Sequence, residues 1–190
     1  MKYFYKDITL EVPENVYYPL EDSELLSDII EKINVKNKKV LDMGCGSGFL
    51  AILLAKKGAI VSAVDINQDA VNVTKKNAKM NDVKIDVMQS DLFEKIKENF
   101  DLIIFNPPYL PIEEDDITYS GGKSGRKTIK KFIINAKKFL NKNGKIILLI
   151  SSLTNENEVI KLFEKNKMKV KILKRKKIPW EELIVIEACL

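Results

Sequence analysis

The chain alternates apolar and polar residues with two different periods, which predicts strands and helices in turn. Short runs of mostly apolar residues are typical of strands. Between them apolar residues recur every three or four positions, as on one face of a helix. The predicted strands are 39–43, 59–64, 83–88, 100–105, 145–151, 169–175 and 183–188. The first predicted helix begins at Glu21. Four further helices are predicted at 49–57, 67–80, 125–140 and 155–165, and a short helical passage is predicted from Ser90.

Strands that alternate with helices predict an α/β fold with a doubly wound, mainly parallel, seven-stranded sheet. The last two strands are separated by a bend at Pro179 and Trp180, so they are expected to form an antiparallel hairpin. Residues 83–88 alternate in the way of a half-exposed edge strand. Residues 1–19 are expected to be short and turn-like. We expect one domain over 1–190, with 1–38 forming an N-terminal cap segment and helix packed on it.

Composition narrows the class of protein. The chain is 45% hydrophobic and 31% charged, which is ordinary for a soluble globular protein. No apolar run approaches the roughly 20 residues of a membrane-spanning helix. The N-terminus lacks the apolar core of a signal peptide, so a cytoplasmic protein is expected.

Histidine is absent from the chain, which excludes several kinds of chemistry. Catalysis by a Ser-His-Asp or Cys-His arrangement is excluded, and so is any metal bound by histidine. The two cysteines, Cys45 and Cys189, are far apart in the sequence. This separation argues against a disulfide framework or an internal zinc site, and no metal is expected.

The net charge is +5, and much of it lies near the C-terminus. A basic patch can bind nucleic acid or an acidic partner. It can also be a solvated edge strand protected by lysines. The second interpretation is slightly favoured because no aromatic residues lie among the basic ones, which are Lys165, Lys167, Lys169, Lys171, Lys174, Arg175, Lys176 and Lys177.

A polar or glycine-rich segment follows each of four successive predicted strands. Open α/β sheets bind ligands at the carboxyl ends of their strands. The first segment is Asp42-x-Gly44-x-Gly46-x-Gly48, and its glycines allow a ligand to approach a helix N-terminus closely. Its spacing is neither GxGxxG nor a P-loop. A tight turn is the alternative, which three glycines in five residues make less favoured.

Two carboxylates follow the next two strands. Asp65 could accept hydrogen bonds from both hydroxyls of a ribose, and a helix N-cap is the less favoured alternative. Asp91 could accept from an adenine amino group, with Leu92 or Phe93 against the ring. A cap is an almost equally supported alternative for Asp91.

The fourth segment is Asn106-Pro107-Pro108-Tyr109. Prolines end a strand because they cannot donate a backbone hydrogen bond, and they keep the preceding residue extended. Asn106 is therefore held at a strand end near a flat aromatic ring, which suits a site for a planar nitrogen group. A proline-rich turn is the alternative, and the three preceding segments favour the binding site.

These motifs, in this order, resemble class I S-adenosylmethionine-dependent methyltransferases, which have a Rossmann-like fold. The Asn-Pro-Pro-Tyr motif resembles the branch that methylates amide or exocyclic amino nitrogens. Residues 18–23 and 120–126 are similar to the HemK-like group, and more narrowly to the archaeal and eukaryotic methyltransferases of class-1 translation release factors. Leu20 and Ser23 depart from the alanine and threonine expected there, and serine keeps the hydroxyl group.

The resemblance implies S-adenosylmethionine as cofactor and N5-methylation of the glutamine amide in the Gly-Gly-Gln motif of a release factor. It implies catalysis by Asn106, Pro107 and Tyr109, with Pro108 also contacting the substrate. The cofactor-binding residues that it implies are Tyr18, Ser23, Asp42, Gly44, Gly46, Gly48, Asp65, Ile66, Asp91, Leu92 and Asn106.

The resemblance also implies a partner, a small zinc-binding activator that extends the sheet at the Val83–Met88 edge strand. Alternative substrates are an exocyclic base amine of RNA or DNA, which the basic C-terminal segment favours, and a protein lysine. A non-enzyme alternative is a cofactor-binding scaffold subunit. The intact Asn106 and the unbroken glycine turn argue against the scaffold.

Overall fold

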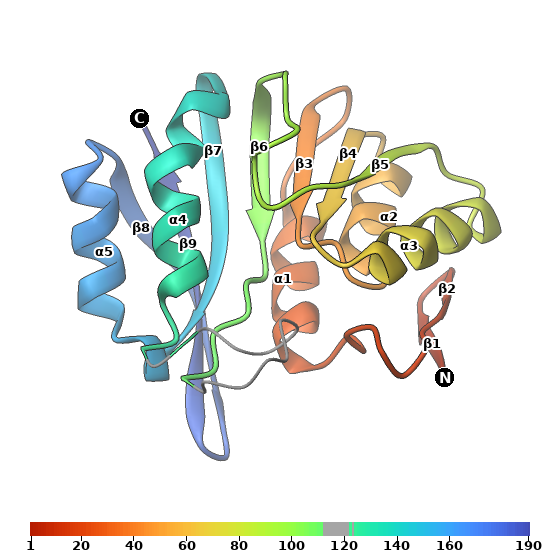
Figure 1. Cartoon of the computed structure of the whole chain (residues 1–190), viewed down its shortest axis with the longest axis horizontal. Helices are drawn as coiled ribbons and strands as arrows, with labels where there is room; N and C mark the ends of the chain where they lie inside the picture. The colour runs from red at the N-terminus through yellow and green to blue at the C-terminus, as the bar shows by residue number, and fades with distance from the viewer. Residues whose placement is uncertain (112–121, 123) are drawn as a thin grey trace. The chain divides into compact units, whose positions relative to one another are not determined.

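The helices and strands of the computed structural model follow one another in the predicted alternation (Figure 1). The structure describes residues 1–111, 122 and 124–190. They divide into two compact units, Met1–Phe100 and Asp101–Leu190. Most of the long loop predicted at 106–123, including its acidic run, lies outside the described residues. The prediction of a single domain remains a prediction.

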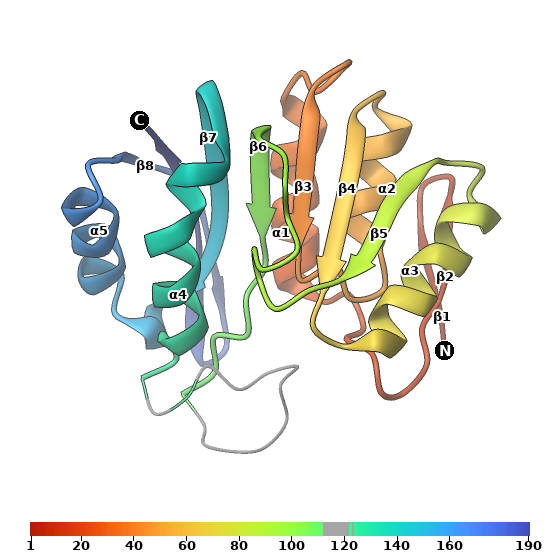
Figure 2. The same cartoon turned by 45° about the horizontal axis from the view of Figure 1, so that its top comes forward.

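The first unit contains a parallel sheet with three helices packed beside it. Strands β3, β4 and β5 pair in parallel and lie side by side (Figure 2), and α2 packs against both α1 and α3. Helix α2 is apolar almost throughout, and Phe49–Leu54 are all buried. In chain order the elements are β1 (Lys2–Tyr5), β2 (Ile8–Glu11), α1 (Glu21–Lys32), β3 (Lys39–Met43), α2 (Phe49–Lys56), β4 (Ile60–Asp65), α3 (Gln68–Met80) and β5 (Ile85–Gln89).

The second unit contains antiparallel pairs covered by two helices. β9 pairs with β7 on one side and with β8 on the other, both antiparallel, and α4 and α5 lie next to each other. The elements are β6 (Phe100–Phe105), which begins at the end of the first unit, α4 (Lys127–Ala136), a 3₁₀ turn η1 (Lys137–Phe139), β7 (Leu140–Ser151), a 3₁₀ turn η2 (Ser152–Thr154), α5 (Glu156–Lys165), β8 (Lys169–Ile178) and β9 (Glu181–Cys189).

Strand pairing gives a seven-stranded sheet in the order β5-β4-β3-β6-β7-β9-β8. The predicted fold class is confirmed, including the C-terminal antiparallel hairpin of β8 and β9. The strand predicted at 83–88 is β5, and it does lie at an edge. The basic C-terminal strand, β8, lies at the opposite edge of the sheet, and whether its lysines keep that edge solvated stays a prediction. No helix of the described residues is long and apolar enough to cross a membrane.

The prediction for residues 1–19 was wrong in part, because β1 and β2 pair as a hairpin. Asn77 of α3 and Asn81, the residue that caps its C-terminus, supply hydrogen bonds to the second strand of the hairpin. The backbone N–H and C=O of Thr9 both bond to the Asn81 amide, at 3.0 and 2.7 Å. Those of Glu11 both bond to the Asn77 amide, at 3.0 Å each. These partners lie far away in the sequence, so the local pattern does not reveal them.

Other predicted boundaries also differ, most of them by one to three residues at a strand end. Residues 91–95 form turns rather than a helix, and Leu92 has a φ of 48°, which a right-handed helix excludes. Strand β7 begins at Leu140 rather than Lys145, because helix α4 ends at Ala136 and a 3₁₀ turn completes the connection. The Asn141 side chain in this added stretch donates to Asp101 at 2.9 Å.

Candidate active site

The glycine turn after β3 uses backbone angles that favour glycine. Gly44, Gly46 and Gly48 have φ values of 68°, 52° and 84°, all in the left-handed region. A Cβ atom at Gly48 would lie 3.0 Å from the side chain of Thr74. The turn is therefore closely packed against α3, and a larger residue at 48 would push the two apart.

Polar side chains of α3 hold this turn in place. The Thr74 hydroxyl donates to the Gly46 carbonyl at 3.0 Å, and the Asn77 amide donates to the Ser47 carbonyl at 2.8 Å. Both side chains are fully buried. Neither residue was predicted as part of the site, although polar residues on the apolar face of a predicted helix are a signal that could have found them.

Asp65 connects β4 to the glycine turn. Its carboxylate accepts from the backbone N–H of Gly46 and from that of Asn67, both at 2.9 Å. Burial raises the pKa of Asp65, and these backbone donors act in the opposite direction. An ionised carboxylate has about four acceptor sites, so this one can still accept from ligand hydroxyls. Asn67, at the start of the predicted helix 67–80, is the cap of α3, as expected from the sequence, and its side chain accepts from the Asp69 N–H at 2.9 Å.

Asp42 is enclosed in the interior of the first unit, with only 2% of its surface exposed. Its Oδ2 accepts no hydrogen bond from the residues that the structure describes. Burial raises the pKa of Asp42 to about 7; the Ala51 backbone N–H opposes this shift and the negative charge of Asp65 adds to it. A buried oxygen in this state is a ready acceptor for a donor brought by a ligand.

The loop after β5, Ser90–Leu92, contacts the loop after β4, which holds Asp65 and Ile66, at the same end of the parallel strands. The Ser90 N–H donates to the Asp65 carbonyl at 2.9 Å, and the Gln89 amide donates to the Ile66 carbonyl at 2.9 Å. Ile66 is 48% exposed, an unusual state for an isoleucine. Leu92 is half-buried, whereas Phe93 is buried, so Leu92 is the better placed of the two to meet a planar ring.

The segment before α1 reaches the glycine turn through Tyr17, and the cofactor contact predicted for Tyr18 stays a prediction. A Cβ atom at Gly46 would lie 3.8 Å from the Tyr17 Cβ, and the Tyr17 hydroxyl donates to Asp22 at 2.5 Å. Tyr18 instead packs edge-on against Tyr3 and donates to the Lys2 carbonyl. Ser23 is buried in the first turn of α1. Tyr17 and Tyr18 are adjacent, and nothing in the sequence indicates which of them reaches the glycine turn.

The Asn106–Tyr109 segment follows β6 directly and belongs to the second unit. Pro107 is buried, whereas Asn106, Pro108 and Tyr109 are half-buried. The side-chain oxygen of Asn106 is itself buried. A rigid amide at a strand end can therefore meet a small planar group with little loss of conformational freedom on binding.

Gly125 packs against this segment so closely that only glycine fits. Its φ is 66°, and a Cβ atom there would lie 2.4 Å from the backbone oxygen of Tyr109. The next residue, Arg126, donates to the Thr154 carbonyl at 2.7 Å, and the Thr154 hydroxyl donates to the Ser151 carbonyl at 2.7 Å. The end of β7 thus supports the loop that packs on Tyr109.

Residues 21–177 match the family described as methyltransferase small domain. The chain belongs to this family and is an enzyme of the methyltransferase class.

Its relatives confirm the predicted resemblance to the HemK-like group. It is 45% identical to a Methanocaldococcus jannaschii protein provisionally named a protein N5-glutamine methyltransferase, over 95% of each chain. It is 34% identical to the release factor glutamine methyltransferase of Lactococcus lactis, over 77% of this chain and 60% of that one. Among solved structures, the E. cuniculi Mtq2–Trm112 complex, described as methylating the termination factor eRF1, matches with a TM-score of 0.78 and 27% identity, covering 92% of this chain and 98% of that one.

Proposed function

We propose that this protein transfers a methyl group from S-adenosylmethionine to the side-chain amide nitrogen of a glutamine in the Gly-Gly-Gln motif of a class-1 translation release factor. The observation that carries the proposal is the rigid Asn106–Tyr109 segment at the end of β6, with the buried side-chain oxygen of Asn106. The names of the M. jannaschii and L. lactis relatives support a glutamine acceptor. We expect the reaction to take place in the cytoplasm.

The first unit offers the groups that S-adenosylmethionine needs. Asp65 is a half-buried carboxylate suited to the ribose hydroxyls, and the exposed Ile66 and half-buried Leu92 offer apolar surface to adenine. Asp91 is assigned to the adenine amino group. The glycine turn would approach the methionine part, because its three glycines leave the backbone uncovered. The other residues assigned to the cofactor are Asp42, Tyr18, Ser23 and Asn106.

When bound, the cofactor supplies an electrophilic methyl group on a sulfonium. An amide nitrogen is a weak nucleophile because its lone pair is delocalised into the carbonyl. The Asn106 Oδ1 and the Pro107 carbonyl would accept from the two N–H groups of the substrate amide, which orients the nitrogen. Tyr109 and Pro108 would pack on the amide plane. Such positioning can contribute on the order of 7–11 kcal/mol to lowering the barrier.

This arrangement needs no general base. The nitrogen becomes acidic once it is methylated, so its proton can leave to water late in the reaction. A chain with no histidine is consistent with that role, since Asn106 holds the nitrogen and removes no proton.

The test is a transfer assay with labelled S-adenosylmethionine and purified release factor, followed by mass spectrometry of the Gly-Gly-Gln peptide. One methyl group on the glutamine is expected. Asn106→Ala should lower kcat/KM by at least about 100-fold, because the nitrogen is no longer oriented. Asn72→Ala, on the exposed face of α3, is the matched control and should leave the rate unchanged.

The same assay separates the alternatives. Label on RNA or DNA, or on a lysine, instead of the glutamine would overturn the proposed acceptor. Binding of S-adenosylmethionine with no transfer to any of these acceptors would instead indicate a scaffold subunit.

The proposal includes a small partner subunit, which the resemblance implies to be zinc-binding. β5 is an edge strand with Ile85 half-buried and Val87 buried, so a partner strand can pair with its free side. The partner subunit in the Mtq2–Trm112 complex supports such an assembly. Co-expression with a candidate partner should give a stable complex, and a charge at position 85 (Ile85→Asp) should disrupt it. Full activity of the isolated chain would argue against the partner.

A further inference from the structure

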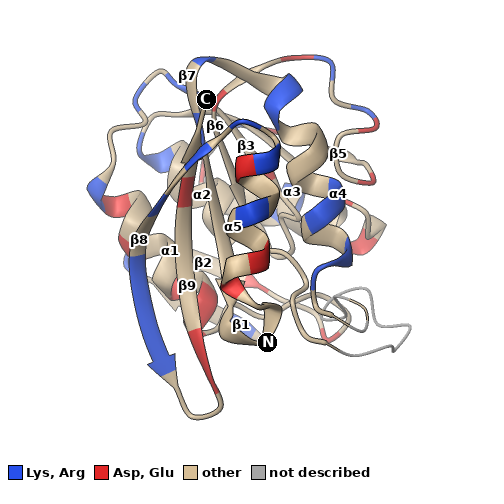
Figure 3. Cartoon of the chain, turned by 90° about the vertical axis from the view of Figure 1, so that its left-hand side faces the viewer, with Lys and Arg blue, Asp and Glu red and all other residues tan. Residues whose placement is uncertain are grey.

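The positive charge of the chain is concentrated in residues 165–178, which the proposed methyl transfer does not use. This segment holds eight basic residues and no acidic residue. The chain has a net charge of +5, so all other residues together carry −3. The segment includes β8, whose lower half is the blue strand in Figure 3.

Four lysines form a row on one face of β8. Strand residues alternate between faces, and the pairing with β9 shows which residues share one. An irregularity between Ile172 and Lys174 keeps the row continuous, with steps of about 7 Å where the strand is regular. Within the described part of the chain, Lys169 and Lys171 are exposed and form no ion pair. The row consists of Lys169, Lys171, Lys174 and Lys176.

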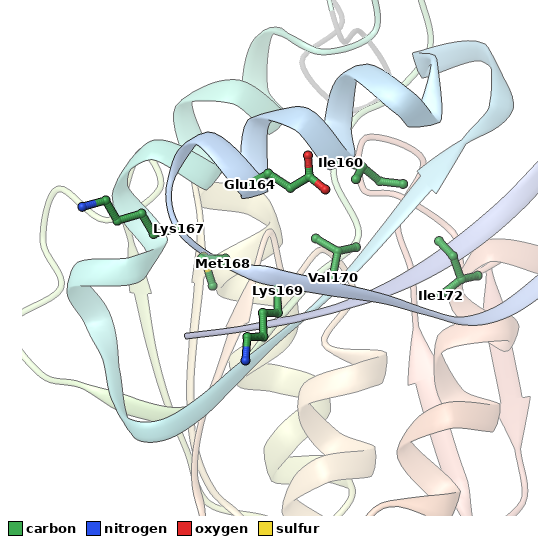
Figure 4. A pocket seen from close by; sticks show the side chains of 7 residues that line it. All are labelled: Ile160, Glu164, Lys167, Met168, Lys169, Val170 and Ile172. Atoms are coloured by element: carbon green, nitrogen blue, oxygen red, sulfur yellow. The ribbon is translucent and has the colours of Figure 1, made fainter.

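The other face of β8 forms a partly apolar groove with α5. Val170 and Ile172 point toward α5, whereas Lys169 points away from it (Figure 4). The groove has a volume of about 520 Å³. Ile160 of α5 and Met168 add to its apolar lining, and the charged residues Glu164, Lys167 and Lys169 also line it. Farther along β8, Arg175 bonds to Glu156 of α5 at 2.7 Å.

The outer edge of β8 has no strand beside it among the described residues. Backbone N–H and C=O groups on such an edge can pair with an added strand. The lysine row, the groove and this edge belong to the same stretch of chain. An added strand would present side chains to both faces with the same two-residue repeat.

We propose that the edge of β8 binds an extended segment of a partner protein in which apolar and acidic residues alternate. Its backbone pairs with β8, its apolar side chains enter the groove beside α5, and its acidic side chains meet the lysine row. Single-stranded nucleic acid fits less well. Residues 165–178 include no aromatic side chain on which bases could stack, and phosphates would leave the apolar groove unused.

The test uses a labelled ten-residue peptide that alternates valine and aspartate, titrated with the full chain by fluorescence anisotropy at low salt. Saturable binding is expected, together with slower hydrogen exchange of β8 amides. The charge-reversed pair Lys169→Glu and Lys171→Glu should weaken binding at least about tenfold, since acidic side chains then face acidic ones. The matched pair Lys36→Glu and Lys38→Glu, exposed before β3, should change it less than about twofold.

The groove is tested separately. Ile160→Ser should also weaken the alternating peptide, and a peptide of equal composition with its valines grouped together should bind at least about tenfold more weakly. Three results would each overturn the proposal: no saturable binding, equal binding of the grouped peptide, or no slowing of exchange in β8. Tighter binding of a ten-nucleotide oligouridylate, lost in the Lys169 and Lys171 variant, would identify a nucleic-acid surface instead.

Discussion

Asp42 is a carboxyl group in an apolar interior. It lies on the buried strand β3 between Leu41 and Met43, which are 0% and 1% exposed. Burial disfavours the charged form, and Asp65 adds a second negative charge nearby. The proton on Asp42 is therefore held more tightly in the folded chain than in the unfolded one.

We predict that the stabilising contribution of this bound proton is lost as pH rises from about 4 to about 7, so the protein becomes less stable over this range. The pKa of Asp42 is raised from 3.8 to about 7, so the folded state binds the proton that the unfolded state has lost. Its contribution to the free energy of unfolding is present at low pH and falls by up to about 1.4 kcal/mol per pH unit through this window.

Asp42→Asn removes the ionisation and serves as the comparison. Urea denaturation at about pH 8 should find the variant more stable than the wild type, with a smaller advantage at about pH 5. The raised pKa of Asp65 acts in the same direction in both proteins. A difference independent of pH would contradict the prediction.

Gly125 provides a second prediction for a single residue. Gly125→Ala should destabilise the protein by about 2–4 kcal/mol, because the new methyl group would overlap the Tyr109 carbonyl at an unfavourable φ. Gly58→Ala is the control. It has a φ of 84° but meets only the flexible Lys36 side chain at 3.4 Å, so a loss of about 1–2 kcal/mol is expected. Equal losses in chemical denaturation would show that the contact with Tyr109 is unimportant.

Residues whose chemistry is visible in the motifs could be predicted from the sequence. The structure brings Asp65, the glycine turn and Ser90–Leu92 together, because parallel strands end at one edge. Tyr17 could not be predicted, since its place depends on packing between segments that are distant in the sequence. The roles assigned to the site residues remain predictions.

At the level of elements, β3 and β6 match the prediction at both ends. Each is a short apolar run, and a glycine turn ends β3 whereas a pair of prolines follows β6. The local sequence is therefore enough to predict where these strands end. The hairpin of β1 and β2 was missed because Asn77 and Asn81, separated from it by 66 and 72 positions, complete its second strand.

We predict that these two asparagines attach the hairpin to α3. Asn81→Ala should leave the Thr9 backbone groups without their partners and speed hydrogen exchange in β2 at least about tenfold, with the sheet of β3–β5 unaffected. Asn77→Ala should do the same and also loosen the glycine turn, through the lost bond to Ser47. Asn72→Ala on the exposed face of α3 should change neither. Uniform exchange changes in all three variants would argue against a local role.

At the scale of the whole molecule, the sequence predicted the fold class and both edge strands. Alternating strands and helices leave few other arrangements. Charge is unevenly distributed over the molecule. The excess of basic residues lies in residues 165–178, which include β8, and all other residues together have a net negative charge.

We predict that S-adenosylmethionine stabilises the molecule as a whole. At a concentration about 100 times its Kd it should add about 2.7 kcal/mol, which raises the Tm by about 5–10 °C. Asp65→Ala should remove most of this shift, each variant being compared with its own ligand-free Tm. Asp86→Ala, an exposed carboxylate on β5, is the control and should keep the shift. An unchanged shift in the Asp65 variant would refute its assignment to the ribose.

The side-chain amides that take the place of a strand beside β2 have a consequence for the ageing of the protein. Each amide uses its nitrogen as a donor and its oxygen as an acceptor, so both atoms are needed. Deamidation of Asn77 or Asn81 would turn that donor into a second acceptor facing a backbone carbonyl. Slow chemical damage at one buried amide would thus release the N-terminal hairpin while the rest of the fold persists.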